Sequence, residues 1–465
     1  MRSPVIYAII GFLFCNAQVY SLLDAVEQAL AHNLPLRQAE LTFANQQTEL
    51  QLARKQFFGV FPSFSLSYLD ARGVERRESV RLDALQKFPF GGSLQFFTTS
   101  SHTAFPLSYA SSLGITFSLP FGEAGGRRFA LLGVEAARWA FLQNEIDFWL
   151  KRQDIIRGAV AVYLSAWQAK QNWKIRQDTL KQSELLLELN KTKYELGLIA
   201  EPEYLRAQVN YENAQVDVLS AERAYLNALQ NLAQFLGFPP DTPVEVVDEI
   251  SFLLPEQPPE EETLQKVLRQ NPTLKRLSYQ EKIQELNLFS SRRKILPEGS
   301  LVVNYSLDST GTDFEAGSRL DNYTISAGVS VRLPLRTTIE QLQYEQTSRA
   351  YQAFLIEAEE TRRSVLKEVS QRLRVIAEGL ASLKILEKSL RNAENSFRLI
   401  QESYSEGLAT ILDFQSEQQR LAQVRLQYVN ARVNLLNNFI ALQRDLGEDA
   451  WVFLKNLFPS GGEAS

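Results

Sequence analysis

The chain repeats itself at one constant offset, and this duplication restricts its fold more than any other feature of the sequence. The motif Tyr-Glu-Leu-Gly-Leu at 194–198 returns 210 positions later as Tyr-Ser-Glu-Gly-Leu at 404–408. The tripeptide Phe-Leu-Gly at 235–237 returns at the same offset as Asp-Leu-Gly at 445–447. Since nothing is inserted or deleted between the two matches, the sequence predicts two copies of one structural module.

Each copy has the same predicted order of elements: shorter helices, strands, and two long helices joined by a Gly-Leu turn. A proline-free run of about 70 residues would span ~105 Å as a helix, and the run after the turn ~57 Å. We therefore expect one long helix beside two shorter helices in series. The first repeat is 18–238, with helices 22–59, 127–196 and 199–237 and strands within 62–121; a proline-rich acidic connector is 239–261; the second repeat is 262–450, with helices 262–295, 336–406 and 408–446 and strands within 299–335; the C-terminal tail is 451–465, of which 459–465 is expected to be disordered.

Residues 1–17 have the features of a signal for export. A positive charge precedes a short apolar run, and the Cys-Asn-Ala sequence that follows at 15–17 fits cleavage after Ala17. A buried helix is one alternative. Lipid attachment at Cys15 is a weaker one, because Phe14 stands where a small residue is wanted. We expect an exported chain that contains no cysteine after cleavage.

Four stretches alternate between apolar residues and small or polar residues, which is the pattern of β-strands with one apolar face. A soluble sandwich fits the same alternation, but in an exported chain the pattern favours strands whose apolar face meets lipid. Mean hydropathy is −0.19, and no apolar run reaches the ~20 residues of a membrane-spanning helix, which excludes a polytopic helical membrane protein. The stretches are 63–68, 113–119, 300–306 and 323–333.

Four strands are too few to close a barrel, and an open sheet edge is not tolerated in lipid. We therefore expect the chain to oligomerise, and three chains would give a barrel of twelve strands. Residues 79–100 leave one question open, because Gly91 and Gly92 would turn a further hairpin. That hairpin would lie either in the barrel or beyond it.

The helices that follow the two Gly-Leu turns each carry two apolar seams. A helix in a two-stranded coiled coil needs one seam, whereas a helix with neighbours on both sides, as in a cylinder of helices, needs two. A central helix of a bundle is the alternative. The sequence leaves open which polar face would line the lumen. In the first copy the seams include Ala214, Ala221 and Leu232, and Val216, Leu219 and Leu226.

The composition removes most catalytic chemistry. The chain has only 2 His and 1 Cys, far apart in sequence, so no Cys/His metal site or Cys-His nucleophile pair is available. A net charge of −5 with interspersed signs offers no basic stripe for nucleic acid. We expect no enzyme, no cofactor and no metal. A periplasmic adaptor would carry one helical hairpin rather than two, and a structural coiled-coil tether would lack the strands.

The order and duplication of three motifs resemble the TolC family of outer-membrane channels. These are the Tyr-x-x-Gly-Leu turn, the entries Asn-x-Pro-Leu at 33–36 and Asn-Pro-x-Leu at 271–274, and strands that close in Leu-Pro. The resemblance covers essentially the whole mature chain. It implies a homotrimer in the outer membrane, with a twelve-stranded β-barrel continued by a periplasmic α-helical barrel. It also implies an exit duct for a tripartite efflux pump or type I secretion, which docks a periplasmic adaptor and an inner-membrane transporter of the RND, ABC or MFS type.

The resemblance further implies residues at the periplasmic mouth. Asp413 matches the aspartate of the constriction, Tyr404 the tyrosine before the second turn, and Glu203 the acidic residue after the first. A threefold ring of Asp413 would concentrate negative potential, so that closure responds to cations and pH. For Tyr404 and Glu203, packing and solvation of the helix turns is an equal alternative. Ser416 and Ala409 depart from the pattern, since the best-known member has a second aspartate and a gating arginine there.

The two Gly-Leu turns form the tips of the helical hairpins in this interpretation. Gly197 and Gly407 are expected to take positive φ, as a turn between long antiparallel helices requires. By resemblance, these glycines with Leu198 and Leu408 would contact the adaptor. The substrate is not readable from the sequence, because a shared duct needs no binding pocket for its cargo.

Overall fold

The structure of the chain is a computed structural model, which describes residues 18–71, 75–104, 107–239, 242–250, 255–332 and 338–458. The predicted signal peptide, the Leu-Pro strand end at 333–334 and the expected disorder of 459–465 lie outside the described residues. The chain divides into two compact units. We call residues 1–40, 148–274 and 363–465 the helical unit, and residues 41–147 and 275–362 the sheet unit.

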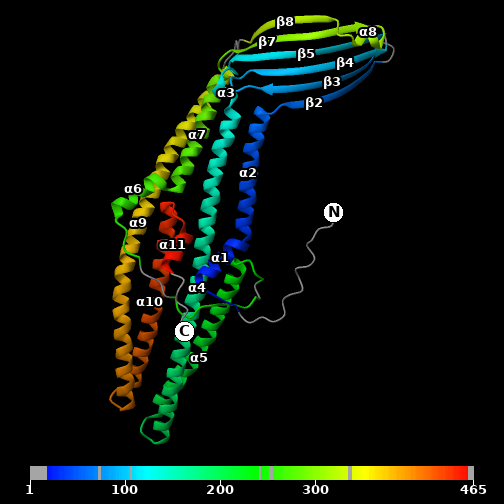
Figure 1. The fold of residues 1–465 in the computed structure, drawn as a ribbon. Coiled ribbons are helices and arrows are strands. Elements are labelled where there is room, and N and C mark those ends of the chain that lie inside the picture. The colour runs from blue at the N-terminus through cyan, green and yellow to red at the C-terminus, as the bar shows by residue number, and fades with distance from the viewer. Residues whose placement is uncertain are drawn as a thin grey trace. The chain divides into compact units, whose positions relative to one another are not determined.

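The sheet unit is built on one antiparallel sheet of six strands in the order β2-β3-β4-β5-β7-β8 (Figure 1). Gly91 turns the chain between β3 and β4 with φ +99°, and its N–H donates to the Phe88 carbonyl over 2.9 Å. The short helices α3 (Arg127–Ala130) and α8 (Phe314–Ser318) also belong to this unit. The strands are β2 (Phe61–Ala71), β3 (Glu75–Lys87), β4 (Ser93–Ala104), β5 (Leu107–Gly122), β7 (Glu298–Gly311) and β8 (Asn322–Arg332).

The sheet contains six strands, two more than the four alternating stretches of the sequence. The segment whose position the sequence left open, 79–100, forms most of β3 and β4, and this hairpin is inserted between β2 and β5. The physical reason is cross-strand pairing: β3 forms a full ladder with β2 on one side and with β4 on the other, and β4 forms one with β5. The other strand predictions are confirmed within the described residues, because β2, β5 and β7 contain the first three alternating stretches and β8 contains 323–332 of the fourth.

Four helices have residues in both units. Helix α4 has 64 residues and α9 has 68, or about 96 and 102 Å at ~1.5 Å per residue. The predicted run from 127 is interrupted at Leu131, which ends α3. Among the described helices, none is long and apolar enough to cross a membrane. The four helices are α2 (Leu34–Phe58), α4 (Leu132–Glu195), α7 (Pro272–Arg293) and α9 (Thr338–Ser405).

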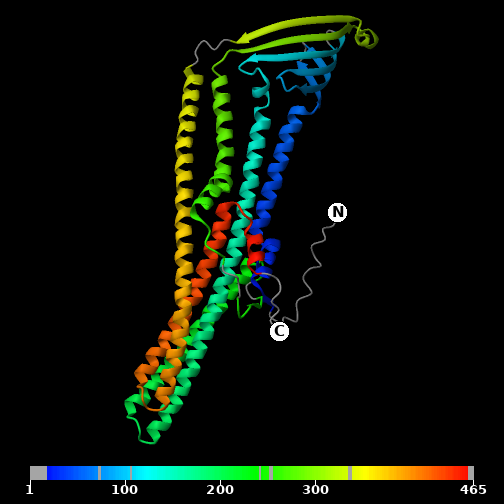
Figure 2. The same ribbon diagram turned by 60° about the vertical axis from the view of Figure 1, so that its left-hand side comes forward.

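The helical unit contains two hairpins, α4–α5 and α9–α10, whose helices lie side by side in both views (Figure 1, Figure 2). Its largest core surrounds the fully buried Tyr163 and Ile156 of α4. Part of the connector joins this core, since β6 pairs in parallel with β1 and buries Val244 and Val246 there. The remaining elements are α1 (Leu22–His32), α5 (Glu201–Phe235), α6 (Glu260–Gln270), α10 (Ile411–Leu446), α11 (Ala450–Leu457), β1 (Gln18–Tyr20) and β6 (Val244–Val246).

A buried asparagine in each copy places the two shorter helices in series. Asn33 donates from Nδ2 to the Phe235 carbonyl at the end of α5 over 3.1 Å and accepts at Oδ1 from the Leu36 N–H in α2. Asn271 repeats both bonds in the second copy, between the end of α10 and the start of α7. One side chain therefore satisfies a carbonyl and an N–H that have no partner within their own helix ends. This is the structural role of the duplicated asparagine motif.

The predicted C-terminal tail begins with a docked helix. Helix α11 buries Ala450, Leu454 and Leu457 in the core of the helical unit. Asp449 caps it by accepting from the Trp451 N–H over 3.0 Å, and it also accepts from Arg152 on α4 over 2.7 Å. The short segment is therefore held by α4 rather than extended.

Candidate functional site

The two Gly-Leu turns have the geometry that the sequence predicts. Gly197 takes φ +70° and Gly407 φ +80°. In each turn the N–H of the following leucine bonds to the carbonyl five residues earlier, over 2.8 Å in both cases, which closes the preceding helix in a Schellman motif. A Cβ on either glycine would meet nothing within 4 Å, so conformation rather than space selects glycine there.

The leucines of the turns are open to solvent. Leu198 is 69% exposed and Leu408 78%, and Leu196 beside them is 68% exposed. Single exposed leucines are ordinary on a protein surface, but here the two copies present them at corresponding positions. They are available for contact with a partner.

Tyr404, by contrast, is buried. It is 6% exposed, and its hydroxyl donates to Oδ1 of the fully buried Asn190 over 2.7 Å. Lys193 donates from Nζ to the Tyr404 carbonyl and lies 4.7 Å from the centre of its ring. Burial raises the pKa of the Tyr404 hydroxyl, so it remains a hydrogen-bond donor at physiological pH. This residue of α9 is thus bonded to α4.

Aromatic side chains surround this hydrogen bond. The Phe414 ring of α10 lies 5.6 Å from the Tyr404 ring and 5.3 Å from the Phe397 ring. Leu186 and Ala207 from the first hairpin belong to the same hydrophobic cluster. We call Asn190, Lys193, Phe397, Tyr404 and Phe414 the tip cluster. It packs the hairpin α9–α10 against the hairpin α4–α5.

Two further polar contacts join the hairpins along α10, and sequence reasoning missed both. Gln418, 3% exposed, donates to the Thr179 carbonyl over 3.0 Å and to the Ser183 hydroxyl over 3.3 Å. Arg425 lies 3.5 Å from Asp178 of α4 and 3.4 Å from Glu394 of α9. Gln418 could have been found from its heptad seam, because a polar residue beside apolar seam positions needs a buried partner.

The two copies differ at these positions although the sequence repeats. Gln208, the counterpart of Gln418, donates only along its own helix to Glu212 over 3.0 Å at an exposed site. Tyr194, the counterpart of Tyr404, is 40% exposed and stacks on Tyr204 with the ring centres 5.5 Å apart. Of each duplicated pair, only the residue of the second copy, Tyr404 or Gln418, makes a buried polar contact with the other hairpin.

Thr410 is the N-cap residue of α10, and Asp413 completes a capping box with it. One carboxylate oxygen accepts from the Thr410 N–H over 2.9 Å and from the Thr410 hydroxyl over 2.7 Å, and the Asp413 N–H donates to that hydroxyl. These bonds from Thr410 hold the pKa of Asp413 below its usual range, and the residue is exposed. The Ser416 hydroxyl donates to the Asp413 carbonyl over 2.9 Å, within the same turn.

Glu203 is the predicted site residue that the structure brings close to Tyr404. It is exposed in the first turn of α5, and its negative charge contributes to the raised pKa of the Tyr404 hydroxyl. Among the residues that the structure describes, no cluster of three or more His, Cys, Asp or Glu side chains is arranged to hold a metal ion. The site therefore offers packing, hydrogen bonds and charge at the ends of two hairpins.

Comparisons with known proteins relate the sequence to one family. The sequence profile of the family described as outer membrane efflux protein matches residues 25–238 and 263–448. The outer membrane protein TolC of Vibrio cholerae serotype O1 is 22% identical over 339 residues, which cover 72% of this chain and 76% of that protein.

Two solved structures share the fold at low sequence identity. The outer membrane protein VceC from Vibrio cholerae has a TM-score of 0.71 at 16% identity, with 92% of this chain and 96% of that one covered. The CmeC outer membrane channel of Campylobacter jejuni has a TM-score of 0.69 at 15% identity, with 94% and 88% covered.

Proposed function

Because the chain belongs to the outer membrane efflux protein family, we propose that its tip cluster is the gate of a channel. The chain is an outer membrane protein that extends into the periplasm and serves as an exit duct for efflux or type I secretion. The family's proteins are channels rather than enzymes, and the family implies a trimer that works with an adaptor and an inner-membrane transporter.

The buried bond between Tyr404 and Asn190 is the observation that carries the gate proposal. Opening a mouth between hairpins requires one hairpin to move away from the other. Such a movement would break this bond and expose Phe397 and Phe414, which lie in the same cluster. A buried hydrogen bond contributes about 1 kcal/mol, and an unsatisfied buried partner costs about 1–3 kcal/mol. The tip cluster therefore favours the closed arrangement.

Deletion of the gene tests the proposal that the protein is an exit duct. We expect deletion of its gene to increase susceptibility to dyes and detergents, or to abolish export of a secreted protein. The protein itself should fractionate with the outer membrane as an oligomer. A soluble periplasmic monomer, or a deletion that changes neither susceptibility nor export, would contradict the assignment.

A ring of Asp413 is proposed to control cations at the mouth. Asp413→Asn removes the charge but keeps an oxygen that can accept from Thr410, so the cap survives. We expect block of single-channel current by divalent cations to weaken several-fold in planar bilayers. The matched control is Thr410→Ala, which removes the cap, worth about 1 kcal/mol, but leaves the charge. Equal block in wild type and Asp413→Asn would remove Asp413 from the mouth.

The same proposal predicts how cation block depends on pH. A folded pKa below the usual value of about 3.9 means that Asp413 stays charged when an ordinary carboxyl is half protonated. Cation block should therefore persist at pH about 4 and disappear only as the pH falls below the folded pKa. The stability that the cap contributes is present above the unfolded pKa and is lost over the same acid range.

We propose the turns with Leu198 and Leu408 as the adaptor contact. Their exposure and their symmetric placement in the two copies support this contact. Leu408→Asp should reduce site-specific cross-linking of the adaptor to the channel while the trimer remains intact. Leu185→Asp offers a control, because Leu185 is also exposed, at 60%, but lies away from the turn. Equal cross-linking in Leu408→Asp and wild type would exclude this turn. The transporter in such a complex would be of the RND, ABC or MFS type.

A further inference from the structure

We propose that three copies of this chain close an eighteen-stranded barrel, because the β3–β4 hairpin forms part of the barrel wall. The proposal rests on the outer membrane function and on the trimer that the family implies. Three sheets of six strands give eighteen. The sequence-based expectation of twelve assumed four strands per chain.

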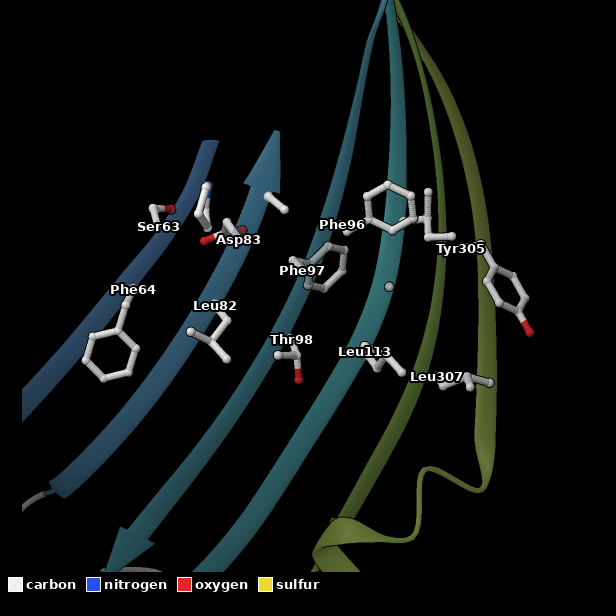
Figure 3. Close-up of a pocket in the computed structure, with 14 residues that line it drawn as sticks. Ser63, Phe64, Leu82, Asp83, Phe96, Phe97, Thr98, Leu113, Tyr305 and Leu307 are labelled. Atoms are coloured by element: carbon white, nitrogen blue, oxygen red, sulfur yellow. The ribbon is translucent and has the colours of Figure 1, made fainter. Parts of the chain in front are cut away.

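The outward face of the hairpin continues the apolar band of the neighbouring strands. Phe96 of β4 stands opposite Ala84 of β3 and Ile115 of β5 in the ladder. Leu82 of β3 stands opposite Phe64 of β2 in the same way. Figure 3 shows Phe64, Leu82 and Phe96 along an apolar groove that runs across β2, β3, β4, β5 and β7. A hairpin beyond the membrane would have no reason to keep this band at the same level.

The opposite face of the hairpin is polar and internally bonded. Arg81 donates to Asp83 over 2.7 Å, and Gln95 of β4 donates to the other Asp83 oxygen over 2.8 Å. The Arg81 guanidinium lies 5.6 Å from the centre of the Phe97 ring. Charged and polar groups on one face with an apolar band on the other is the division between lumen and lipid.

The hairpin fits β5 closely rather than lying loosely beside it. The Phe97 ring covers Gly114 of β5, where an added Cβ would come within 2.6 Å of the ring. An aromatic ring over a glycine on the next strand fixes the register of the pair. Ser101 and Ser306 on the polar face are buried, whereas Phe96 and Leu113 on the apolar face are each 46% exposed. The polar face is thus the more crowded one at these positions.

The two edges of the sheet suit a second copy of the chain. In the described sheet, β2 pairs only with β3 and β8 only with β7, so each has one row of unpaired backbone groups. Each edge strand has 11 residues. Six alternating strands make the two edges antiparallel to each other, so β8 of one copy can continue the antiparallel ladder onto β2 of the next. Open edges in lipid must be paired in this way.

The strand number sets the width of the barrel. With strands ~4.8 Å apart and tilted by ~40°, eighteen strands form a ring about 36 Å across, and twelve form a ring about 24 Å across. The barrel proposed here is therefore about 1.5 times as wide as the sequence suggests. Its cross-section is roughly twice as large.

The decisive measurement compares the full chain with a deletion of residues 75–104. This deletion removes β3 and β4 and leaves 72–74 and 105–106 to connect β2 with β5. Removing two strands together keeps the apolar faces of β2 and β5 on the same side. Native mass should show a trimer for both proteins in lipid nanodiscs, and averaged electron-microscopy end views should give barrels that differ 1.5-fold in diameter. A full-length trimer with the narrower ring, or a full-length dimer, would overturn the proposal.

Paired cysteines test whether β3 and β4 lie in the barrel wall, and this test does not require the deletion variant to fold. The hydroxyls of Ser67 and Ser79 lie 2.6 Å apart, and those of Ser100 and Ser111 lie 3.4 Å apart. Cysteine pairs at both places should form disulfides in the assembled full-length channel, with Ser300→Cys/Ser330→Cys as the control on β7 and β8, whose hydroxyls are 2.8 Å apart. A disulfide between Ser67→Cys and Ala110→Cys instead would place β2 directly against β5 and exclude the hairpin from the wall.

These outcomes separate the strand count from the function. A trimer that conducts in planar bilayers but has a narrow ring contradicts the eighteen strands alone. A protein that does not reach the outer membrane contradicts the function on which the proposal rests.

Discussion

Tyr404→Phe should raise the open probability of the purified channel in planar bilayers. The substitution keeps the ring among Phe397 and Phe414 but removes the hydroxyl that donates to Asn190. The closed arrangement then contains a buried amide oxygen without its donor, which costs about 1–3 kcal/mol. A change of that size shifts an equilibrium by roughly 5- to 150-fold. In the proposed trimer each copy carries the substitution, so its effect on the mouth acts three times in one channel.

The duplication supplies the control for this experiment. Tyr194→Phe makes the same chemical change at the corresponding place in the first copy, where the tyrosine is partly exposed and stacks on Tyr204. Open probability should remain at the wild-type value. Gln418→Ala should act in the same direction as Tyr404→Phe, since its side chain also bonds the second hairpin to α4. If Tyr404→Phe and Tyr194→Phe behave alike, the Tyr404 bond is part of the packing and not of the gate.

Asp449→Ala should cause the largest loss of stability among single surface-accessible substitutions in the helical unit. The carboxylate accepts from Arg152, from Gln153 over 3.1 Å and from the Trp451 N–H. Its loss removes the cap of α11, worth about 1 kcal/mol, and leaves the buried Gln153 amide without one partner, which costs about 1–3 kcal/mol. Urea unfolding of the solubilised channel should show a decrease of roughly 2–4 kcal/mol.

The pH dependence of stability distinguishes the contribution of the Asp449 charge from that of its hydrogen-bonding geometry. Burial alone would raise the pKa of this carboxyl, but the hydrogen bonds from Arg152, Gln153 and Trp451 lower it overall. A lowered folded pKa gives stability that is present above the unfolded pKa and lost as the pH falls through the folded pKa. The difference between wild type and Asp449→Ala should therefore shrink below pH about 4. Asp449→Asn keeps the cap and should lose less; a difference that is constant with pH would show that charge plays no part.

The duplication predicted much of the molecule because it fixes relations between distant segments. It predicts the two turns with positive φ at Gly197 and Gly407, and it places corresponding helices in corresponding order. It does not reveal what the repeated asparagines do. Each of them bonds to a carbonyl more than 170 positions away, and no local pattern records such a contact.

The elements that sequence reasoning left open or missed depend on tertiary contacts. In β3 the charges of Arg81 and Asp83 obscure the alternation, and they become compatible with a membrane strand only when they bond each other on the polar face. In β4 the adjacent Phe96 and Phe97 break the period, yet one faces the apolar side and the other covers Gly114. Helix α11 is too short to be stable alone and needs its anchor on α4.

The sequence predicted the positions of the candidate gate residues but not their contacts, because those contacts are also tertiary. The resemblance identified Tyr404 and Asp413 by position, but a one-dimensional pattern does not distinguish a buried donor from an exposed cap. The structure gives Tyr404 a partner in Asn190 and gives Asp413 a partner in Thr410. The two residues therefore carry different proposals, one for the stability of the closed arrangement and one for the charge of the mouth.

The position of the β3–β4 hairpin also limits how such a sheet can evolve. Adding a single strand would leave the two edges of the sheet parallel to each other, and a ring of antiparallel copies would no longer close. Adding a pair of strands preserves both the direction of the edges and the side on which each face lies. Barrel width can therefore change only in steps, and with three copies each step is a gain or loss of six strands. A short duplication or deletion between β2 and β5, within one gene, is enough to take such a step.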